Sequence, residues 1–231
     1  MKTQKSLVGI SRFSVAGFLV CLVVLFIAAP FAQMFELGRL IEPSLLTATL
    51  ISAVLAVGHR RQVFWLAVLI LMPTVVGRWL NHFWPETVTP VWFLTCILVF
   101  ILFIIIQLMR FILVAPRVDG EIVCAGISVY LLLGLLWGFA YMLVAWLVPG
   151  AFFFDGRIEA PQEMTSFTSV YFSFVTLSTV GYGDITPVAG VARMLAAAEA
   201  MTGTLFVAIL ISRLVSLYSK QPSATNKEPQ E

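Results

Sequence analysis

The residues best suited to do chemistry in this chain form a short run from Thr179 to Asp184, TVGYGD, between two long apolar segments. Its chemistry can be carried by the backbone, because consecutive carbonyl oxygens that point the same way can replace the hydration shell of a bare cation. Gly181 and Gly183 permit backbone angles that residues with a Cβ rarely adopt. The hydroxyl of Thr179 can add a further oxygen, and Tyr182 is large enough to anchor the strand. The run therefore predicts a cation site built mainly from backbone oxygens.

The elements that must position this run are membrane helices. Of the 231 residues, 60% are hydrophobic and only 11% are charged, whereas a soluble domain carries about 25% charged residues. A helix needs about 20 apolar residues to cross the bilayer. Apolar stretches run approximately over residues 13–32, 40–57, 63–80, 88–114, 121–148 and 188–217. The pattern predicts an all-α membrane protein with six transmembrane helices. The second and third stretches are short enough to form one re-entrant hairpin, but the sequence His-Arg-Arg between them favours a loop in water.

Ten of the 14 Lys and Arg residues fall on one side of the predicted spans. They are Lys2, Lys5, Arg12, Arg60, Arg61, Arg110, Arg117, Arg213, Lys220 and Lys227. By the positive-inside rule, this distribution places both termini in the cytoplasm. We therefore expect a multi-pass protein of the cell (inner) membrane. The net charge of +2 is too small to suggest a nucleic-acid partner.

A short aromatic segment separates the fifth and sixth spans. Residues 150–165 are polar and acidic, which predicts an outer loop, and residues 166–178 are too few to cross the membrane. A helix of about 12 residues is ~18 Å long and reaches roughly the middle of the bilayer. Irregular backbone at that depth is tolerated only where it lines a wet cavity or is packed in protein. The geometry predicts a re-entrant pore helix, followed by a loop that returns outward and lines a pore.

One such loop per chain cannot surround an axis. A ring of carbonyls requires four loops, so we expect four copies of the chain to assemble around a central pore as a homotetramer. Gly134 and Gly138 make a GxxxG step in the fifth span, a pattern that favours helix contacts. A face of small residues follows the sixth span at Ala189, Ala192, Ala196, Ala200 and Gly203. The alternative is that small residues are simply common in membrane helices.

Residues 121–217 resemble the pore module of potassium channels, which consists of an outer helix, a pore helix, a selectivity filter and an inner helix. The stretch YFSFVTLSTVGYGDITP, from Tyr171 to Pro187, is similar to bacterial members of the two-helix-pore ion-channel family. The resemblance implies that the permeant ligand is potassium and that no cofactor is needed. It implies that Gly203 is a hinge of the inner helix, since a glycine can bend a helix there; close packing is the alternative. The residues implied to coordinate potassium are Thr179, Val180, Gly181, Tyr182 and Gly183.

The resemblance divides the chain into a four-helix membrane domain (1–120), a potassium-channel pore domain (121–217) and a polar cytoplasmic tail (218–231) that we expect to be disordered. In six-helix potassium channels the first part often senses voltage through arginines at every third position of the fourth span. Here that span has no basic residue before Arg110. Each arginine moved across the field contributes ~2.3 kcal/mol per 100 mV. We therefore expect little intrinsic voltage dependence.

Two carboxylates near the filter are expected to support it. Asp184 could form an acidic collar at the outer mouth or be tied to the pore helix by hydrogen bonds. Val175 stands where some pore helices of the family carry a glutamate that pairs with this aspartate, which puts that pairing in doubt. Glu199 lies about eleven residues into the sixth span, an expensive place for a carboxylate. It could face the cavity and concentrate cations, or it could be neutral and bonded to the hydroxyls of Thr176 or Ser178 behind the filter.

The sequence as a whole favours a potassium-selective channel that conducts passively. It does not favour an enzyme, because Glu199 stands apart from any cluster of His, Asp, Glu or Cys at membrane depth. The alternatives are a subunit of a potassium transporter and a non-conducting subunit that modifies other channels; the single, intact filter argues against both. The expected partners are the lipid bilayer and further copies of the chain. A separate regulatory subunit is left open, because no ligand-binding domain fits in the tail.

Overall fold

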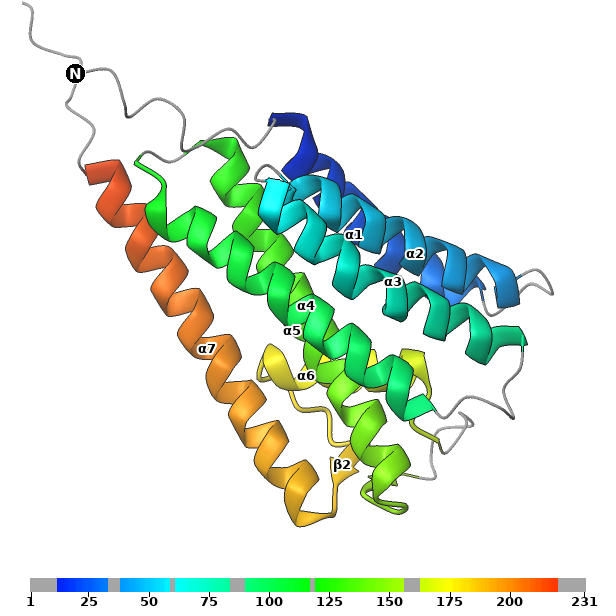
Figure 1. The fold of residues 1–231 in the computed structure, drawn as a ribbon. Coiled ribbons are helices and arrows are strands. Elements are labelled where there is room, and N and C mark those ends of the chain that lie inside the picture. The colour runs from blue at the N-terminus through cyan, green and yellow to red at the C-terminus, as the bar shows by residue number, and fades with distance from the viewer. Residues whose placement is uncertain are drawn as a thin grey trace, which may run out of the picture.

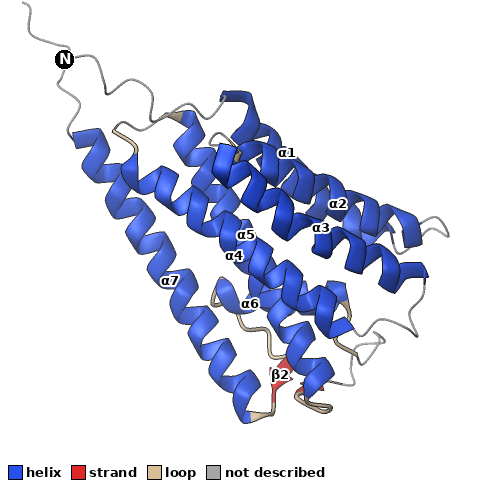
Figure 2. Ribbon diagram, viewed as in Figure 1, coloured by secondary structure: helices blue, strands red, loops and turns tan. Residues whose placement is uncertain are grey.

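The computed structural model describes residues 12–32, 38–58, 61–83, 90–116, 119–155 and 163–219, and almost all of them are helical (Figures 1 and 2). Both ends of every helix lie within three residues of the ends that the sequence predicts. The predicted all-α architecture is therefore confirmed. The predicted tail lies almost entirely outside the described residues. The helices are α1 (Arg12–Ala32), α2 (Gly38–Val57), α3 (Arg61–Phe83), α4 (Pro90–Val114), α5 (Gly120–Leu147), α6 (Ser166–Leu177) and α7 (Gly190–Ser219).

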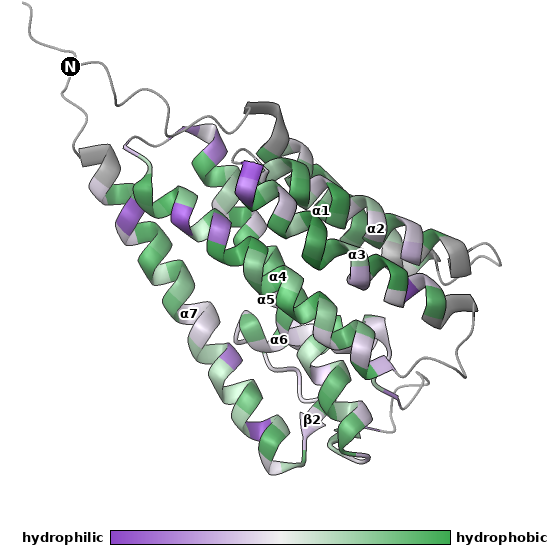
Figure 3. Cartoon of the chain, viewed as in Figure 1, coloured by the Kyte–Doolittle hydropathy of each residue, from purple (hydrophilic) through white to green (hydrophobic). Residues whose placement is uncertain are grey.

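The described helices have the length and surface of membrane helices. Four are long and apolar enough to cross a bilayer, and two shorter apolar helices, Val15–Ala28 and Pro43–Val57, lie in α1 and α2. Hydrophobic residues predominate along the helices (Figure 3), and large hydrophobic side chains are exposed as well as buried. Helices that are hydrophobic all round belong in a membrane or a large core, so the chain is a multi-pass membrane protein. The four long spans are Arg61–Leu80, Pro90–Val114, Gly120–Leu147 and Gly190–Ser216.

Helix α5 lies at the centre of the arrangement. It packs against α1, α4, α6 and α7, and Figure 1 shows α7 along one edge of the bundle and α1 to α3 along the other. The short helix α6 lies between α5 and α7. In the apolar stretch of α5, 61% of the residues are buried, against 17% in α7. Helix α7 therefore has a side that nothing in the single chain covers.

One hydrophobic core joins the first four helices to the helices that follow. It includes Phe18 and Leu22 of α1, Ile97 of α4, Val129 of α5 and Phe206 of α7, each less than 9% exposed. The predicted domain boundary at residue 120 falls between α4 and α5, and these two helices pack against each other along their length. The four-helix part is therefore fixed against the pore part by shared apolar contacts.

The segment after α5 differs from the prediction. The sequence predicts a polar loop over residues 150–165, but Phe152–Phe154 form strand β1, which pairs antiparallel with β2 (Ile185–Pro187). The ring of Phe152 is 8% exposed and packs edge-on against Tyr141. The prediction is wrong for these residues because the strand, and with it the burial of Phe152, depends on pairing with β2, which follows much later in the chain.

Candidate selectivity filter

The short helix α6 sets where the TVGYG run begins. Thr165 caps its first turn, because the Thr165 side-chain oxygen accepts a hydrogen bond from the amide of Thr168 at 3.3 Å. The inner face of α6 is buried, with Ser169 and Ser173 both 0% exposed. The helix ends at Leu177, so only Ser178 separates it from the run. The end of a packed helix therefore fixes the inner end of the predicted cation site.

The last carbonyls of α6 hold the first amides of the run. The amide of Ser178 donates to the carbonyl of Phe174 at 3.0 Å. The carbonyl of Val175 accepts two hydrogen bonds, from the amide of Val180 at 3.0 Å and from the amide of Gly181 at 3.2 Å. Carbonyls that a helix end normally leaves unsatisfied are thus used to turn the chain back on itself. The amides of Thr179, Val180 and Gly181 therefore point toward α6.

The backbone of the run has an alternating conformation. The φ angle is +60° at Thr179, +58° at Gly181 and +80° at Gly183, while Val180 and Tyr182 between them have negative φ. Such an alternation turns successive peptide groups toward the same side instead of opposite sides. Thr179 is the one non-glycine residue with positive φ in the described part of the chain. A β-branched residue in this conformation is strained, and such strain clusters at functional sites.

The run is exposed in the single chain. Val180 is 54% exposed and Tyr182 is 70% exposed. Within one chain, neither the carbonyls nor these side chains are enclosed, although the pore helix beside them is well packed. The run is thus open on the side away from α6.

Asp184 is tied to the pore helix. The hydroxyl of Tyr171 in α6 donates to a carboxylate oxygen of Asp184 at 2.7 Å, and the amide of Asp155, beside β1, donates to the carbonyl of Asp184 at 2.9 Å. Tyr171 lies one turn before Val175 on the same face of the helix. Tyr171, and not the residue at position 175, therefore supplies the pore-helix partner of Asp184.

Glu199 is fully buried, at 0% exposed, and does not face an open cavity. Its carboxyl oxygen Oε1 lies 2.5 Å from the hydroxyl of Ser173 in α6, and its Oε2 accepts a hydrogen bond from the hydroxyl of Tyr141 in α5. The predicted partners, Thr176 and Ser178, are not those that the structure brings together with it. Ser173 lies one turn before Thr176 on α6, so the contact falls on the predicted helix but on a different turn from the predicted residues.

The hydrogen bonds around Ser173 bear on the proton of Glu199. The Ser173 hydroxyl lies 2.7 Å from the carbonyl of Gly134 as well as 2.5 Å from the carboxyl of Glu199. A serine hydroxyl has one proton to donate, and a carbonyl can only accept. If Glu199 carried a proton and donated it to Ser173, each contact would have its own proton and Ser173 could donate fully to Gly134. In that arrangement Glu199 would donate to Ser173 and Ser173 to the carbonyl of Gly134, while Tyr141 donates to the other carboxyl oxygen.

Gly203 lies where α7 meets the end of the pore helix. A Cβ at this position would lie 2.3 Å from the carbonyl oxygen of Leu177, the last residue of α6. A carbon atom cannot lie that close to an oxygen atom without a bond, so only glycine fits at position 203. Helix α7 runs without interruption through Gly203 in this structure. The close approach favours the packing interpretation of this glycine.

The predicted GxxxG step also makes helix contacts. Gly134 and Gly138 in α5 both face α6: a Cβ at Gly134 would meet the ring of Phe174, and a Cβ at Gly138 would lie 3.1 Å from the Cα of Val170. Ala192 of α7 is 0% exposed in a cluster with Tyr141 of α5 and Phe172 of α6, and Ala189 and Ala196 pack against that cluster. Small residues therefore bring α5, α6 and α7 together within one chain.

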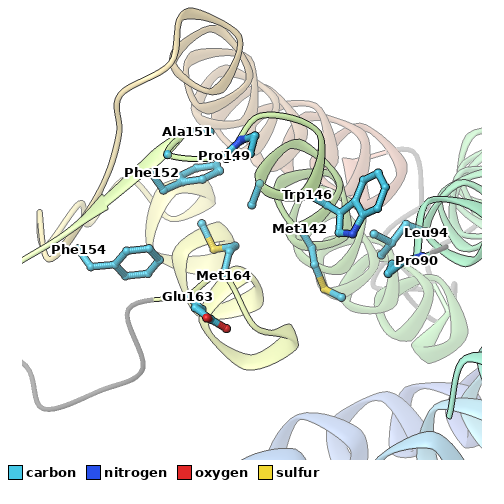
Figure 4. Close-up of a pocket in the computed structure, with 12 residues that line it drawn as sticks. Pro90, Leu94, Met142, Trp146, Pro149, Ala151, Phe152, Phe154, Glu163 and Met164 are labelled. Atoms are coloured by element: carbon cyan, nitrogen blue, oxygen red, sulfur yellow. The ribbon is translucent and has the colours of Figure 1, made fainter. Parts of the chain in front are cut away.

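A cavity of about 500 Å³ lies at the other end of the pore helix. Figure 4 shows the rings of Phe152 and Phe154 on one side of it and Trp146 on the other, with Glu163 at its edge. None of the residues from 179 to 183 lines this cavity. It is therefore not the predicted path of the ion.

Comparison with known proteins agrees with this geometry. Residues 141–220 match the family described as ion channel. This segment holds the end of α5, the pore helix, the filter run and α7. The predicted resemblance to ion channels, rather than to an enzyme family, is therefore confirmed for the part of the chain that carries the motif.

Three relatives show how far the similarity extends. The chain is 40% identical to Protein LctB of Bacillus caldotenax over 86 residues, which are 36% of this chain and 63% of that protein. It is 38% identical to a two-pore potassium channel of Arabidopsis thaliana over 64 residues, 28% of this chain and 22% of that protein. It is 28% identical to a voltage-gated potassium channel regulatory subunit of Gallus gallus over 98 residues, 42% of this chain and 19% of that protein. The chain thus spans less than two thirds of each relative. No solved structure matches it.

Proposed function

We propose that the protein is a potassium-selective channel in which four copies of the chain surround one pore. Potassium ions lose their water at a ring of carbonyl oxygens and cross the membrane down their electrochemical gradient. The coordinating residues are Thr179, Val180, Gly181, Tyr182 and Gly183. The observation that carries this proposal is the alternation of φ along the run, because it supplies a row of carbonyl oxygens on one side of the backbone.

The remaining parts of the chain have supporting roles in this proposal. Asp184 and a neutral Glu199 hold the filter against α6, and Gly203 lets α7 approach the filter closely. The chain crosses the inner membrane six times with both termini in the cytoplasm. The four-helix part contributes little voltage dependence, since α4 carries a single basic residue, Arg110, near its end.

One relative favours a second candidate, a non-conducting subunit that modifies other channels, because its name describes a regulatory subunit. This candidate predicts that the purified chain conducts only when it is mixed with another channel. A transporter subunit has less support, since one chain carries a single filter run where such a subunit would carry several.

Purified protein in planar bilayers distinguishes these functions. With potassium on one side and sodium on the other, the proposed channel gives a reversal potential near the potassium equilibrium potential, without ATP or a proton gradient. A voltage ramp is expected to show little change in open probability. Gly181→Ala is the matched negative variant, because a Cβ is disfavoured by about 1–2 kcal/mol at the positive φ of this residue.

Two results would contradict the proposal. A wild-type protein that passes sodium as well as potassium does not use the ring of carbonyls for selection. A Gly181→Ala protein with the wild-type conductance and reversal potential shows that the backbone of the run is not the ion path.

A further inference from the structure

The pore helix contacts the first helix of the chain directly. The ring centroids of Phe26 in α1 and Phe174 in α6 lie 4.9 Å apart, and the ring planes meet at 88°. This is the edge-to-face geometry that aromatic pairs prefer. The two residues come from the two parts of the chain that the predicted domain boundary separates. Their contact joins the four-helix part to the element that carries the filter.

Gly134 in α5 leaves the space for this contact. A Cβ at Gly134 would lie 2.2 Å from the tip of the Phe174 ring, so the ring occupies space that any other residue would fill. The carbonyl of Gly134 also accepts the hydroxyl of Ser173 at 2.7 Å. Ser173 and Phe174, which are consecutive in the pore helix, therefore both contact Gly134. The ring of Phe174 extends past Gly134 to Phe26.

Phe174 is also connected to the filter. Its carbonyl accepts hydrogen bonds from the amide of Ser178 at 3.0 Å and from the hydroxyl of Ser178 at 2.6 Å. Ser178 directly precedes Thr179, the first residue of the run. The next carbonyl, of Val175, holds the amides of Val180 and Gly181. A shift of Phe174 therefore moves the acceptors that fix the start of the filter, and coupling between distant sites travels through such contiguous contacts.

Phe26 itself is held in place by α1. It follows Leu22 by four residues and so continues the face that Phe18 and Leu22 bury, where these two are 1% and 0% exposed. Phe31, in the same helix, lies on the outer side and is 59% exposed. The position of the Phe26 ring is thus set by the core of the four-helix part.

We propose that Phe26 is a positioning residue for the filter: through Phe174, α1 holds the second half of the pore helix in the conducting arrangement. This gives the four-helix part a role in conduction that needs no charge movement. The inference rests on the proposed function, because it concerns the conducting state of the filter.

The test uses the full chain with Phe26→Leu, Phe174→Leu, the double variant and the control Phe31→Leu. Leucine keeps an apolar side chain, so the fold is retained while the edge-to-face contact is lost. The first measurement is hydrogen exchange of the amides of residues 178 to 181. The second is the ratio of open to closed time of single channels in potassium.

Each single variant is expected to speed exchange in this segment and to lower the open-to-closed ratio by about 2- to 10-fold, the range of an aromatic pair. The double variant should change no more than the larger single effect, because both replacements remove one contact. Phe31→Leu should match the wild type in both measurements. A merely stabilising role of Phe26 would change exchange throughout the protein and leave the open-to-closed ratio unaltered, which would overturn the proposal.

Two further results would also overturn it. Phe26→Leu could behave as the wild type in both measurements, or the two single effects could multiply in the double variant, as independent sites do. Hydrogen exchange does not require conduction. A wild-type protein without potassium current therefore counts against the proposed function, while the exchange data still decide whether Phe26 holds the filter segment.

Discussion

Glu199 is the residue whose chemistry depends most on its surroundings. Its carboxyl is 0% exposed and is shared between Tyr141 of α5 and Ser173 of α6. Leaving an ionised carboxylate in such a place is costly unless it is paired with a cation, and the two side chains that hydrogen-bond to Glu199 here are neutral hydroxyls. A protonated Glu199 would instead join three helices through hydrogen bonds alone.

Glu199→Gln is expected to keep the conductance and the thermal stability of the assembled protein close to wild type. The amide NH₂ can donate to Ser173 and the amide oxygen can accept from Tyr141, which is the pattern of a protonated carboxyl. Glu199→Ala should lower stability by about 1–3 kcal/mol for each buried hydroxyl that loses its partner. Single-channel recording and thermal unfolding in detergent provide the measurements. A large loss of conductance in Glu199→Gln would favour an ionised, cation-attracting carboxylate.

At the scale of the elements, the inner helix and the pore helix meet where there is no room for a side chain. Gly203→Ala is expected to destabilise the protein by about 1–3 kcal/mol, because its Cβ would overlap the carbonyl of Leu177. Gly190→Ala is the matched control in the same helix, since a Cβ there meets nothing within 4 Å. Thermal unfolding of the two variants tests the packing interpretation. Unchanged stability with altered gating in Gly203→Ala would indicate a hinge instead.

In the whole molecule, the filter run and one side of α7 are exposed in the single chain, and the proposed assembly covers them with further copies of the chain. The proposed assembly predicts a detergent-solubilised complex with four times the 25.5 kDa mass of one chain. Native mass spectrometry measures this directly, and a stable dimer or monomer that conducts potassium would contradict it. Apolar residues exposed on α7 in the single chain include Val191, Met194, Met201, Leu205 and Ile209.

Local patterns predicted much of the architecture. Apolar runs of suitable length located the long helices, and the short aromatic segment after them located α6, because helix formation depends on residues close together in sequence. The glycines of the TVGYG run predict unusual backbone angles, and Gly181 and Gly183 both have positive φ. The strain at Thr179 could not be predicted, since its side chain disfavours the conformation that the end of α6 imposes.

Amino-acid order alone determined which segments are helices, that they belong in a membrane, and where the run of carbonyls begins. Only the tertiary structure decided which side chains meet: Tyr141 and Ser173 bind a carboxyl that lies 58 and 26 residues away, and Phe26 reaches Phe174 past a glycine of a third helix. The physical reason is that helix formation is a short-range property, whereas the contacts between helices depend on how each one is rotated and how closely it can approach its neighbours.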